Sequence, residues 1–330
     1  MKTPRTLIEA IRFFSNQDNC LNYVVPRRWP DGVECPRCGR KDVRFLPNQR
    51  RWECRAKHPR RQFSVKTGTV LEDSPIGLDK WLPAIWMVAN CKNGVSSYEI
   101  ARDLGVMQKT AWFMVHRIRE AMLVEDAPKL AGPIEADETF VGGKAHSTDY
   151  NPETGKLMPT GPRENKTIVM GIVQRKGRAR AFVVGDTTRT TLHEKIKKHV
   201  VERATVYTDD WKGYAKLAAF THFTINHSVQ YVNGHVHING IENFWTLLKR
   251  TIKGTYVCPR SWHLQRYVEE QVFRFNECGG DDAYRFSETV KQIAGKRLTY
   301  KKLTETVDMN QAMIKNRQRM AAMKRLAKQV

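Results

Sequence analysis

The sequence predicts an α/β fold for its second half, with a small cysteine-containing segment and a helical segment before it. The α/β prediction rests on apolar, strand-like runs at residues 134–141, 167–174, 179–185 and 204–208. A helical pattern at about 190–202 separates the last two runs. Upstream, the helical pattern extends from residue 78 to about 122, and residues 33–70 are too short and too rich in Arg, Gly and Pro to build an ordinary core.

These patterns divide the 330 residues into five expected segments, which is reasonable for a chain long enough for two or three domains. The segments are an N-terminal helical segment at 1–30, a zinc ribbon at 31–70, a helix-turn-helix domain at 71–127, a catalytic domain at 128–280 and a basic helical tail at 281–330. Within the catalytic segment, residues 143–165 are expected to form a polar loop, and helices are expected at 241–253 and 262–277.

The composition favours a polyanionic partner. Fifty-six Lys and Arg residues against 34 Asp and Glu give a formal net charge of +22 and an isoelectric point of about 9.8, which favours binding through nucleic-acid phosphates. No apolar run approaches the roughly 18 residues of a membrane span, and an odd number of cysteines, seven, argues against a secreted disulfide framework. We expect a cytoplasmic protein.

A metal site is expected at Cys35, Cys38, Cys54 and His58. The pair Cys35-x2-Cys38 is followed by Gly39, and Cys54 stands four residues before His58. Thiolates and an imidazole are the ligands that tetrahedral zinc prefers, and the spacing between the two pairs suits a ribbon hairpin. The second pair has Cys-x3-His where Cys-x2-Cys is more usual, so the fourth ligand, His58, departs from the common pattern.

Residues 95–121 have the pattern of a helix-turn-helix. Ser96 and Glu99 are spaced as a capping box at the start of a helix, and Gly105 would form the turn. The second helix would then open with Gln108, Lys109 and Thr110, at the end that meets base edges in the major groove. An ordinary helical hairpin has the same pattern, and the basic charge favours DNA contact.

Three acidic residues, far apart in sequence, are the candidate catalytic group. Asp137 and Asp209 end strand-like runs, and Glu242 opens an aromatic-rich helical segment. We prefer Asp209 over its neighbour Asp210, because Asp209 directly ends its strand and Asp210 would face the other way. Carboxylates gathered in this way can hold two Mg²⁺ ions for in-line phosphoryl transfer.

Other polar residues surround this group in the sequence. Lys249 lies seven positions after Glu242, on the same side of the helix, where its ammonium can hold a DNA phosphate. Asn239 shares the helical face of Glu242 and can support or replace it. His235 and His237 are weaker candidates, and Phe244 and Trp245 are expected in the core.

Together these motifs resemble the transposases of the IS1595 insertion-sequence family, also called ISXO2-like. The resemblance extends from about residue 15 to 280. The matching blocks lie at residues 28–39, 63–69, 95–121, 135–144, 208–209 and 239–250.

The resemblance implies a catalytic domain with an RNase H-like fold and an acidic triad followed by a lysine. It places Asp137 on the first strand, Asp209 after the fourth and Glu242 on the following helix, with Lys249 as the lysine. It implies DNA contacts at Lys144, Lys249 and Arg250 in addition to those of the helix-turn-helix. The expected cofactors are two catalytic Mg²⁺ ions and one structural Zn²⁺ ion. The resemblance also implies a bacterial, nucleoid-associated protein.

The function implied is cleavage of the ends of an insertion sequence and joining of their 3′-hydroxyls to target DNA. The partners would be the terminal inverted repeats, the target DNA and at least a second copy of the chain, because two ends must be brought together. Two other readings stay open. A zinc-ribbon regulator would explain only the first 125 or so residues, and a different RNase H-like nuclease would not need two DNA-reading modules.

Overall fold

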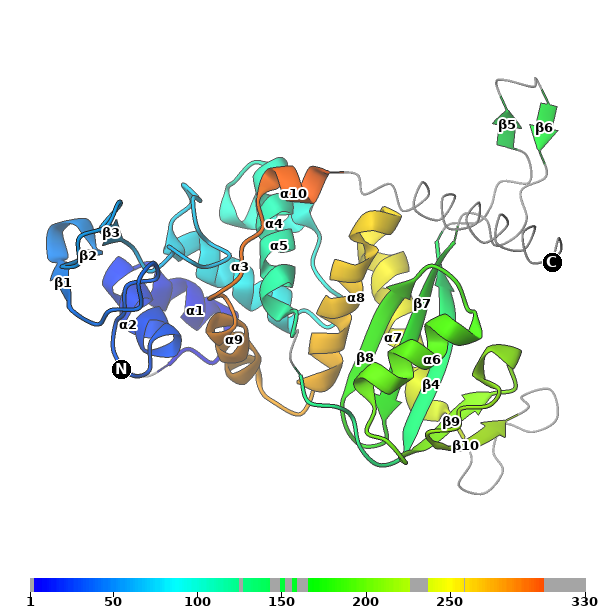
Figure 1. Ribbon diagram of the computed structural model, residues 1–330. Helices are drawn as coiled ribbons and strands as arrows, with labels where there is room; N and C mark the ends of the chain where they lie inside the picture. The colour runs from blue at the N-terminus through cyan, green and yellow to red at the C-terminus, as the bar shows by residue number, and fades with distance from the viewer. Residues whose placement is uncertain are drawn as a thin grey trace, which may run out of the picture. The chain divides into compact units, whose positions relative to one another are not determined.

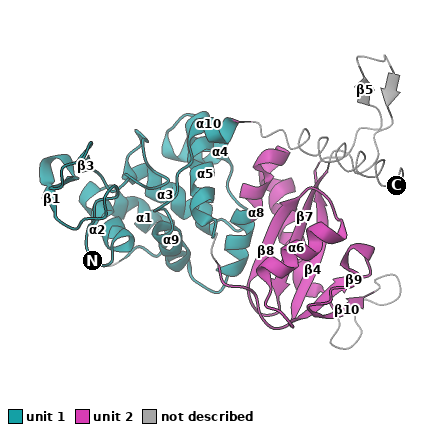
Figure 2. Cartoon of the chain, in the orientation of Figure 1, with its two compact units in different colours: residues 1–125, 269–304 teal, residues 126–268, 305–330 magenta. Residues whose placement is uncertain are grey.

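The structure is a computed structural model that describes most of the chain. The described residues are 3–124, 127–142, 149–151, 156–158, 166–225, 237–257 and 259–305. They fall into two compact units (Figure 2), unit 1 with residues 1–125 and 269–304, and unit 2 with residues 126–268 and 305–330. No helix among the described residues has the length and apolar character required to cross a membrane.

Unit 1 contains a small antiparallel ribbon. Its strands are β1 (Val43–Leu46), β2 (Arg51–Cys54) and β3 (Gln62–Phe63), with β2 in the centre. A short 3-10 turn, η1 (Pro47–Gln49), joins β1 to β2. The rings of Trp52 and Phe63 stack 6.1 Å apart, and Trp29 packs against Trp52 at 5.7 Å. Three aromatic rings are a small core for a ribbon of this size.

The rest of unit 1 is helical. Its helices are α1 (Leu7–Phe14), α2 (Gln17–Arg28), α3 (Leu78–Asn90), α4 (Ser97–Leu104), α5 (Gln108–Met122), α9 (Asp282–Lys291) and α10 (Tyr300–Thr304). The central one is α3, which packs against α1, α5 and α9 and is buried at every position from 81 to 89. Helix α8 (Ser261–Asn276) spans the division between the units.

Residues beyond 281, expected as a tail, contribute to the core of unit 1. Phe286 of α9 is fully buried, and its ring centroid lies 5.6 Å from Phe14, 5.3 Å from Tyr23 and 5.0 Å from Trp86. The structure therefore places residues 282–304 with the N-terminal helices. Complete burial of the Phe286 ring stabilises this packing, because large aromatic side chains contribute most of their free energy when they are fully removed from water. Residues 306–330 lie outside the described residues.

The capped helix start predicted at residue 96 is present. The Ser96 hydroxyl accepts from the Glu99 amide at 3.1 Å, and the Glu99 carboxylate accepts from the Ser96 amide at 2.7 Å. Gly105 ends α4 with φ of +59°, a left-handed conformation that glycine adopts without strain. Helix α5 begins at Gln108, so the two-helix pattern predicted from the sequence is confirmed.

Unit 2 is built on a five-stranded mixed sheet. Its strands are β4 (Ile134–Val141), β7 (Thr167–Gln174), β8 (Ala179–Val184), β9 (Thr205–Asp209) and β10 (Thr221–Ile225), in the order β10-β9-β4-β7-β8. Strands β4, β7 and β8 are antiparallel neighbours, whereas β4, β9 and β10 are parallel. The four predicted strands are present. The fifth, β10, was not predicted, because it is a short, largely exposed edge strand with His and Thr among its five residues.

Within the expected loop at 143–165, β5 (Asp149–Asn151) and β6 (Lys156–Met158) form a two-stranded antiparallel pair. The remainder of that loop lies outside the described residues.

Two helices cover opposite faces of the five-stranded sheet (Figure 1). Helix α6 (Arg189–His199) buries Leu192 and Ile196 in a cluster with Ile134 and Ala136 of β4. Helix α7 (Asn239–Thr251), followed by the π-helical turn η3 (Ile252–Tyr256), packs on β4 and β7. Because side chains alternate along a strand, the odd-numbered residues of β4 face α7.

The contact between α7 and β7 is close enough to require a glycine. A Cβ atom on Gly171 would lie 2.6 Å from the Trp245 ring and 2.7 Å from the Ile241 side chain. The helix therefore approaches the sheet at a point where no side chain stands between them.

We expect Gly171→Ala to displace the Trp245 ring and lower the free energy of unfolding by about 1–3 kcal/mol, the usual cost of overpacking. Urea denaturation followed by Trp fluorescence measures this. Gly254→Ala is the matched control, because nothing lies within 4 Å of its added Cβ. Equal stability of the two variants would show that α7 can move away from the sheet at little cost.

Candidate metal centres

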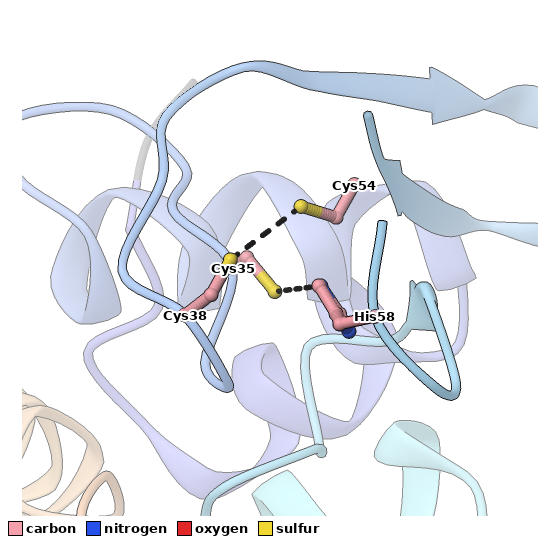
Figure 3. A group of neighbouring side chains, drawn as sticks. All are labelled: Cys35, Cys38, Cys54 and His58. Atoms are coloured by element: carbon pink, nitrogen blue, oxygen red, sulfur yellow. Dashed lines mark hydrogen bonds between the residues drawn. The ribbon is translucent and has the colours of Figure 1, made fainter. Parts of the chain in front are cut away.

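The first candidate centre is the ribbon cluster of Cys35, Cys38, Cys54 and His58 (Figure 3). One ligand atom of each of these side chains lies within 4.8 Å of those of the others. The Sγ atoms of Cys38 and Cys54 are 3.6 Å apart, and Cys35 Sγ is 3.5 Å from His58 Nε2. All four predicted ligands are therefore together, including His58.

This cluster fits a structural zinc ion. Sulfur atoms that are each about 2.3 Å from one zinc in a tetrahedron stand roughly 3.8 Å apart, close to the separation of Cys38 and Cys54. The other ring nitrogen of His58, Nδ1, is 2.8 Å from the Pro59 carbonyl. That contact turns Nε2 toward the sulfur atoms, as an outer hydrogen bond does for a metal-bound histidine.

The second candidate centre is the acidic group of unit 2. Asp137 is on β4, Asp209 is the last residue of β9, and Glu242 is in the first turn of α7. Strands β4 and β9 pair in parallel with Glu135 opposite Tyr207. Two residues further along this register, Asp137 comes beside Asp209.

The three carboxylates are close enough to interact. The pKa of Asp137 is raised to about 6, mainly by burial and also by the negative charges of Asp209 and Glu242, while a hydrogen bond from Trp245 acts in the opposite direction. The structure therefore brings the three predicted residues together. Of the two neighbouring aspartates, Asp209 belongs to this group, whereas Asp210 is exposed to solvent.

The donor set suits hard cations. Carboxylate oxygens are preferred by Mg²⁺ and similar ions, which keep several waters and take only one or two carboxylates each. Among the described residues, only the ribbon cluster gathers three or more potential ligand atoms within 4.8 Å of one another. The carboxylate oxygens of Asp137, Asp209 and Glu242 do not all lie that close together.

Trp245 has a role that its sequence position did not reveal. It was expected in the core and is buried, and its indole Nε1 also donates to Asp137 Oδ2 at 2.8 Å. The donor stabilises the ionised carboxylate and fixes its orientation.

Glu138 is a fourth acidic residue near the group. Its carboxylate accepts a hydrogen bond of 2.5 Å from the Tyr214 hydroxyl. The pKa of Glu138 is raised to about 7, mainly by burial and also by the charges of Asp209 and Asp137, against the lowering effect of the Tyr214 hydrogen bond. Because Glu138 follows Asp137 directly, strand alternation turns it toward the other face of the sheet.

Glu135 fixes the position of α7. Its fully buried carboxylate accepts from Arg175 Nε at 2.8 Å and from the backbone amide of Ile241 at 3.0 Å, and it lies 3.5 Å from His237 Nδ1. A Cβ atom on Gly240 would lie 2.7 Å from the same carboxylate. Glu135 thus holds the first turn of α7, which carries Glu242, on β4. Its spacing of two from Asp137 was a signal that both residues face the same side.

The predicted nucleic-acid contacts lie on two helices. Lys249 and Arg250 are exposed in the last turn of α7. At the start of α5, Lys109 is exposed with its ammonium 5.1 Å from the Tyr300 ring, and the Gln108 amide donates to the Ser97 hydroxyl at 2.9 Å.

Two predicted DNA contacts, Thr110 and Lys144, and two weaker candidates for the acidic site, Asn239 and His235, remain. Thr110 follows on α5 and is partly buried, and Asn239 is exposed at the start of α7. Lys144, like His235, lies outside the described residues.

Comparison with known proteins identifies the family of this chain. Residues 129–276 match the ISXO2-like transposase domain, and residues 15–56 match the transposase zinc-ribbon domain. An uncharacterized protein in transposable element ISH50 of Halobacterium salinarum is 30% identical over 256 residues, which are 73% of this chain and 84% of that protein. An uncharacterized transposase-like protein of Haemophilus influenzae is 38% identical over 96 residues, 28% of this chain and 77% of that protein.

Among solved structures, the Mos1 strand transfer complex matches with a TM-score of 0.25 and 9% identity, over 64% of this chain and 74% of that chain. A similarity that low supports no conclusion about function. The sequence matches define the class: a transposase with an N-terminal zinc ribbon. The chain belongs to the IS1595 family of ISXO2-like transposases.

Removal of the ribbon's zinc should unfold the ribbon, because its aromatic core is too small to replace the metal. We expect the purified protein to contain one zinc per chain, and a chelator to expose Trp29 and Trp52 and shift their fluorescence to longer wavelength. Cys54→Ser should lose the metal, whereas Cys278→Ser, at an exposed cysteine outside the cluster, should keep it. Zinc retained by Cys54→Ser would remove Cys54 from the ligand set.

Glu135→Gln should lower the free energy of unfolding by about 1–3 kcal/mol, because it leaves the Arg175 guanidinium beside a neutral amide. Chemical denaturation of the whole chain measures the loss. Glu288→Gln removes a surface ion pair with Lys291 and should change stability by less than about 1 kcal/mol. A loss no larger at Glu135 than at Glu288 would contradict the anchoring role.

Proposed function

We propose that this protein cuts the ends of an insertion sequence and joins their 3′-hydroxyls to target DNA by metal-dependent phosphoryl transfer. The observation that carries the proposal is the convergence of Asp137, Asp209 and Glu242 on one side of the sheet, with their charges acting on one another. Asp137 is mostly buried beside two other acids, which is unfavourable unless a cation compensates the charge.

The catalytic domain that we propose is RNase H-like. What supports this is the mixed five-stranded sheet, in which the antiparallel strands β4, β7 and β8 are followed by β9 and β10, both parallel to β4. In this arrangement the first and fourth strands lie side by side, and each provides one aspartate.

The residues of the chain would prepare the site for two divalent ions. Asp137, Asp209 and Glu242 would hold these ions, which would supply a lower pKa for the attacking water or hydroxyl and charge stabilisation for the leaving oxygen. Asp137 is oriented for binding by Trp245, and Glu242 is carried to the same place by the anchored helix α7. Lys249, exposed about two turns further on α7, would hold a phosphate of the bound strand. One site would serve both cleavage and joining, since both steps are attacks of an oxygen nucleophile on a DNA phosphate.

Unit 1 would read the DNA. We propose that α4 and α5 form a helix-turn-helix, with Gln108, Lys109 and Thr110 at the end of α5 that meets the bases. The zinc ribbon would extend this contact along the terminal repeat. The chain's net charge of +22 would bind phosphates and fix the register without reading the sequence. Because joining requires two ends, the active assembly would contain at least two copies of the chain.

Asp137→Asn should abolish cleavage and joining while it leaves DNA binding intact. We expect the rate in Mg²⁺ to fall by at least about 100-fold, the scale on which removal of a single electrostatic group from an active site acts. The assay uses a duplex that carries the terminal inverted repeat found in the DNA around the gene, with gel-shift binding measured in parallel. Asp210→Asn is the matched control, because Asp210 is an exposed neighbour of the proposed ligand Asp209.

Three outcomes separate this proposal from its alternatives. Joining by Asp137→Asn at the wild-type rate would remove the triad assignment. Binding by the wild-type protein without any metal-dependent cleavage would indicate a DNA-binding regulator. Cleavage without joining, and without preference for the terminal repeat, would indicate a different nuclease.

A further inference from the structure

A hollow lies beside Asp209, on the side of the strand end where α6 begins. Its volume is about 440 Å³, and it is lined by residues 186–189, before and at the start of α6, and by residues 211–213. None of these residues belongs to the metal-binding group described above. The wall nearest that group is Trp211, whose backbone amide donates to Asp209 Oδ1 at 3.1 Å.

The Trp211 ring is held in place and is still exposed. Its indole Nε1 donates to the Thr187 carbonyl at 3.2 Å, and 44% of the residue is accessible to solvent. A Cβ atom on Gly213 would lie 2.7 Å from Trp211 Nε1, so the glycine leaves the space that the ring occupies. The hydrogen bond fixes the ring with a large aromatic surface exposed to water. A ligand can therefore stack on the ring without the entropic cost of ordering this side chain.

The polar groups around the hollow favour an anionic ligand. The Asp186 carboxylate already has partners, because it accepts from the Thr188 amide and hydroxyl and from the Thr191 hydroxyl, and its one negative charge is outnumbered by two cations in the lining. Arg189 and Lys212 are exposed at the rim, and neither forms an ion pair with another of the described residues. A flat group attached to a phosphate matches an aromatic wall with two cations beside it.

We propose that Trp211 stacks on an unpaired DNA base next to the phosphate that is cut. This inference rests on the proposed function, since it takes Asp209 as a residue that contacts the scissile phosphate. The Trp211 amide is bonded to the Asp209 carboxylate, so the base on the ring would belong to a nucleotide adjoining that phosphate. The base would leave the duplex, and the ring would replace the stacking that it loses.

This arrangement would also select the position of the cut. Only a phosphate whose neighbouring base can leave the stack would sit correctly at Asp137 and Asp209. A mismatched or frayed base pair leaves the stack at a lower cost than a paired one. Trp211 would therefore favour a cut next to a base that is weakly paired or unpaired.

The direct test is photo-cross-linking of the wild-type chain to the terminal-repeat duplex, with 5-iododeoxyuridine placed at each position around the cut. The reaction is run in Ca²⁺, so that cross-linking does not depend on cleavage. We expect one substituted position, adjoining the cut, to cross-link to the peptide that contains Trp211, identified by mass spectrometry. Absence of this cross-link at all positions, with binding intact, would overturn the stacking proposal.

Cleavage rates give the second test. Base stacking on an aromatic side chain is worth about 5- to 150-fold in affinity per base, so Trp211→Ala should slow cleavage of paired DNA by a factor in that range. Trp211→Phe keeps a ring but loses the hydrogen bond to the Thr187 carbonyl, so its cleavage rate should lie between those of the wild type and Trp211→Ala. A mismatch at the adjoining base pair should reduce the defect of Trp211→Ala.

Tyr284→Ala is the matched control, because Tyr284 is equally exposed, at 44%, and lies in unit 1. It should cleave as the wild type does. Wild-type rates for Trp211→Ala would overturn the stacking proposal and leave the proposed function in place. A wild-type chain that cross-links through Trp211 but never cleaves would instead overturn the proposed function.

Discussion

The docking of α7 on the central strand β4 is the contact on which the catalytic half of this protein depends. It joins a fully buried carboxylate, Glu135, to Arg175 and to the Ile241 amide, and it needs a bare backbone at Gly171 for the Trp245 ring. A buried carboxylate is tolerated only when its partners satisfy it. The contacts that satisfy Glu135 hold α7 in place, and they thereby hold Glu242 of that helix beside the two strand aspartates.

The strongly basic chain contains a small acidic group, and the two kinds of charge would have different roles in the proposed function. The excess of Lys and Arg would attract the DNA phosphate backbone, which would provide affinity but no chemistry. At Asp137 the protein does the opposite, since it buries a carboxylate near two others and so raises its pKa. Cations bound to these carboxylates would complete the site, and they would also present positive charge to the DNA phosphate.

Unit 1 reaches stability by two different routes. Its ribbon has few apolar residues and gathers three thiols and one imidazole, so we expect its folding to be coupled to a metal. Its helices instead share a conventional core around α3, completed by Phe286 from beyond the catalytic segment. The chain thus returns to its N-terminal half after α8, and the two units are not simply consecutive in sequence.

The sequence by itself determined the local features: four strands of the sheet, the capped start of α4, the four ribbon ligands and the identity of the three acids. Each was found from its own local context, such as the end of a strand-like run, the start of a helix or a short Cys spacing, which the sequence displays directly. Only the tertiary structure decided which residues form hydrogen bonds to those acids or hold them in position. Trp245, Glu135 and Trp211 act through strand register and through the place where a helix or loop meets the sheet, and β10 joins as a short edge strand without a pattern of its own. Such contacts join residues far apart in the chain, so no local pattern specifies them.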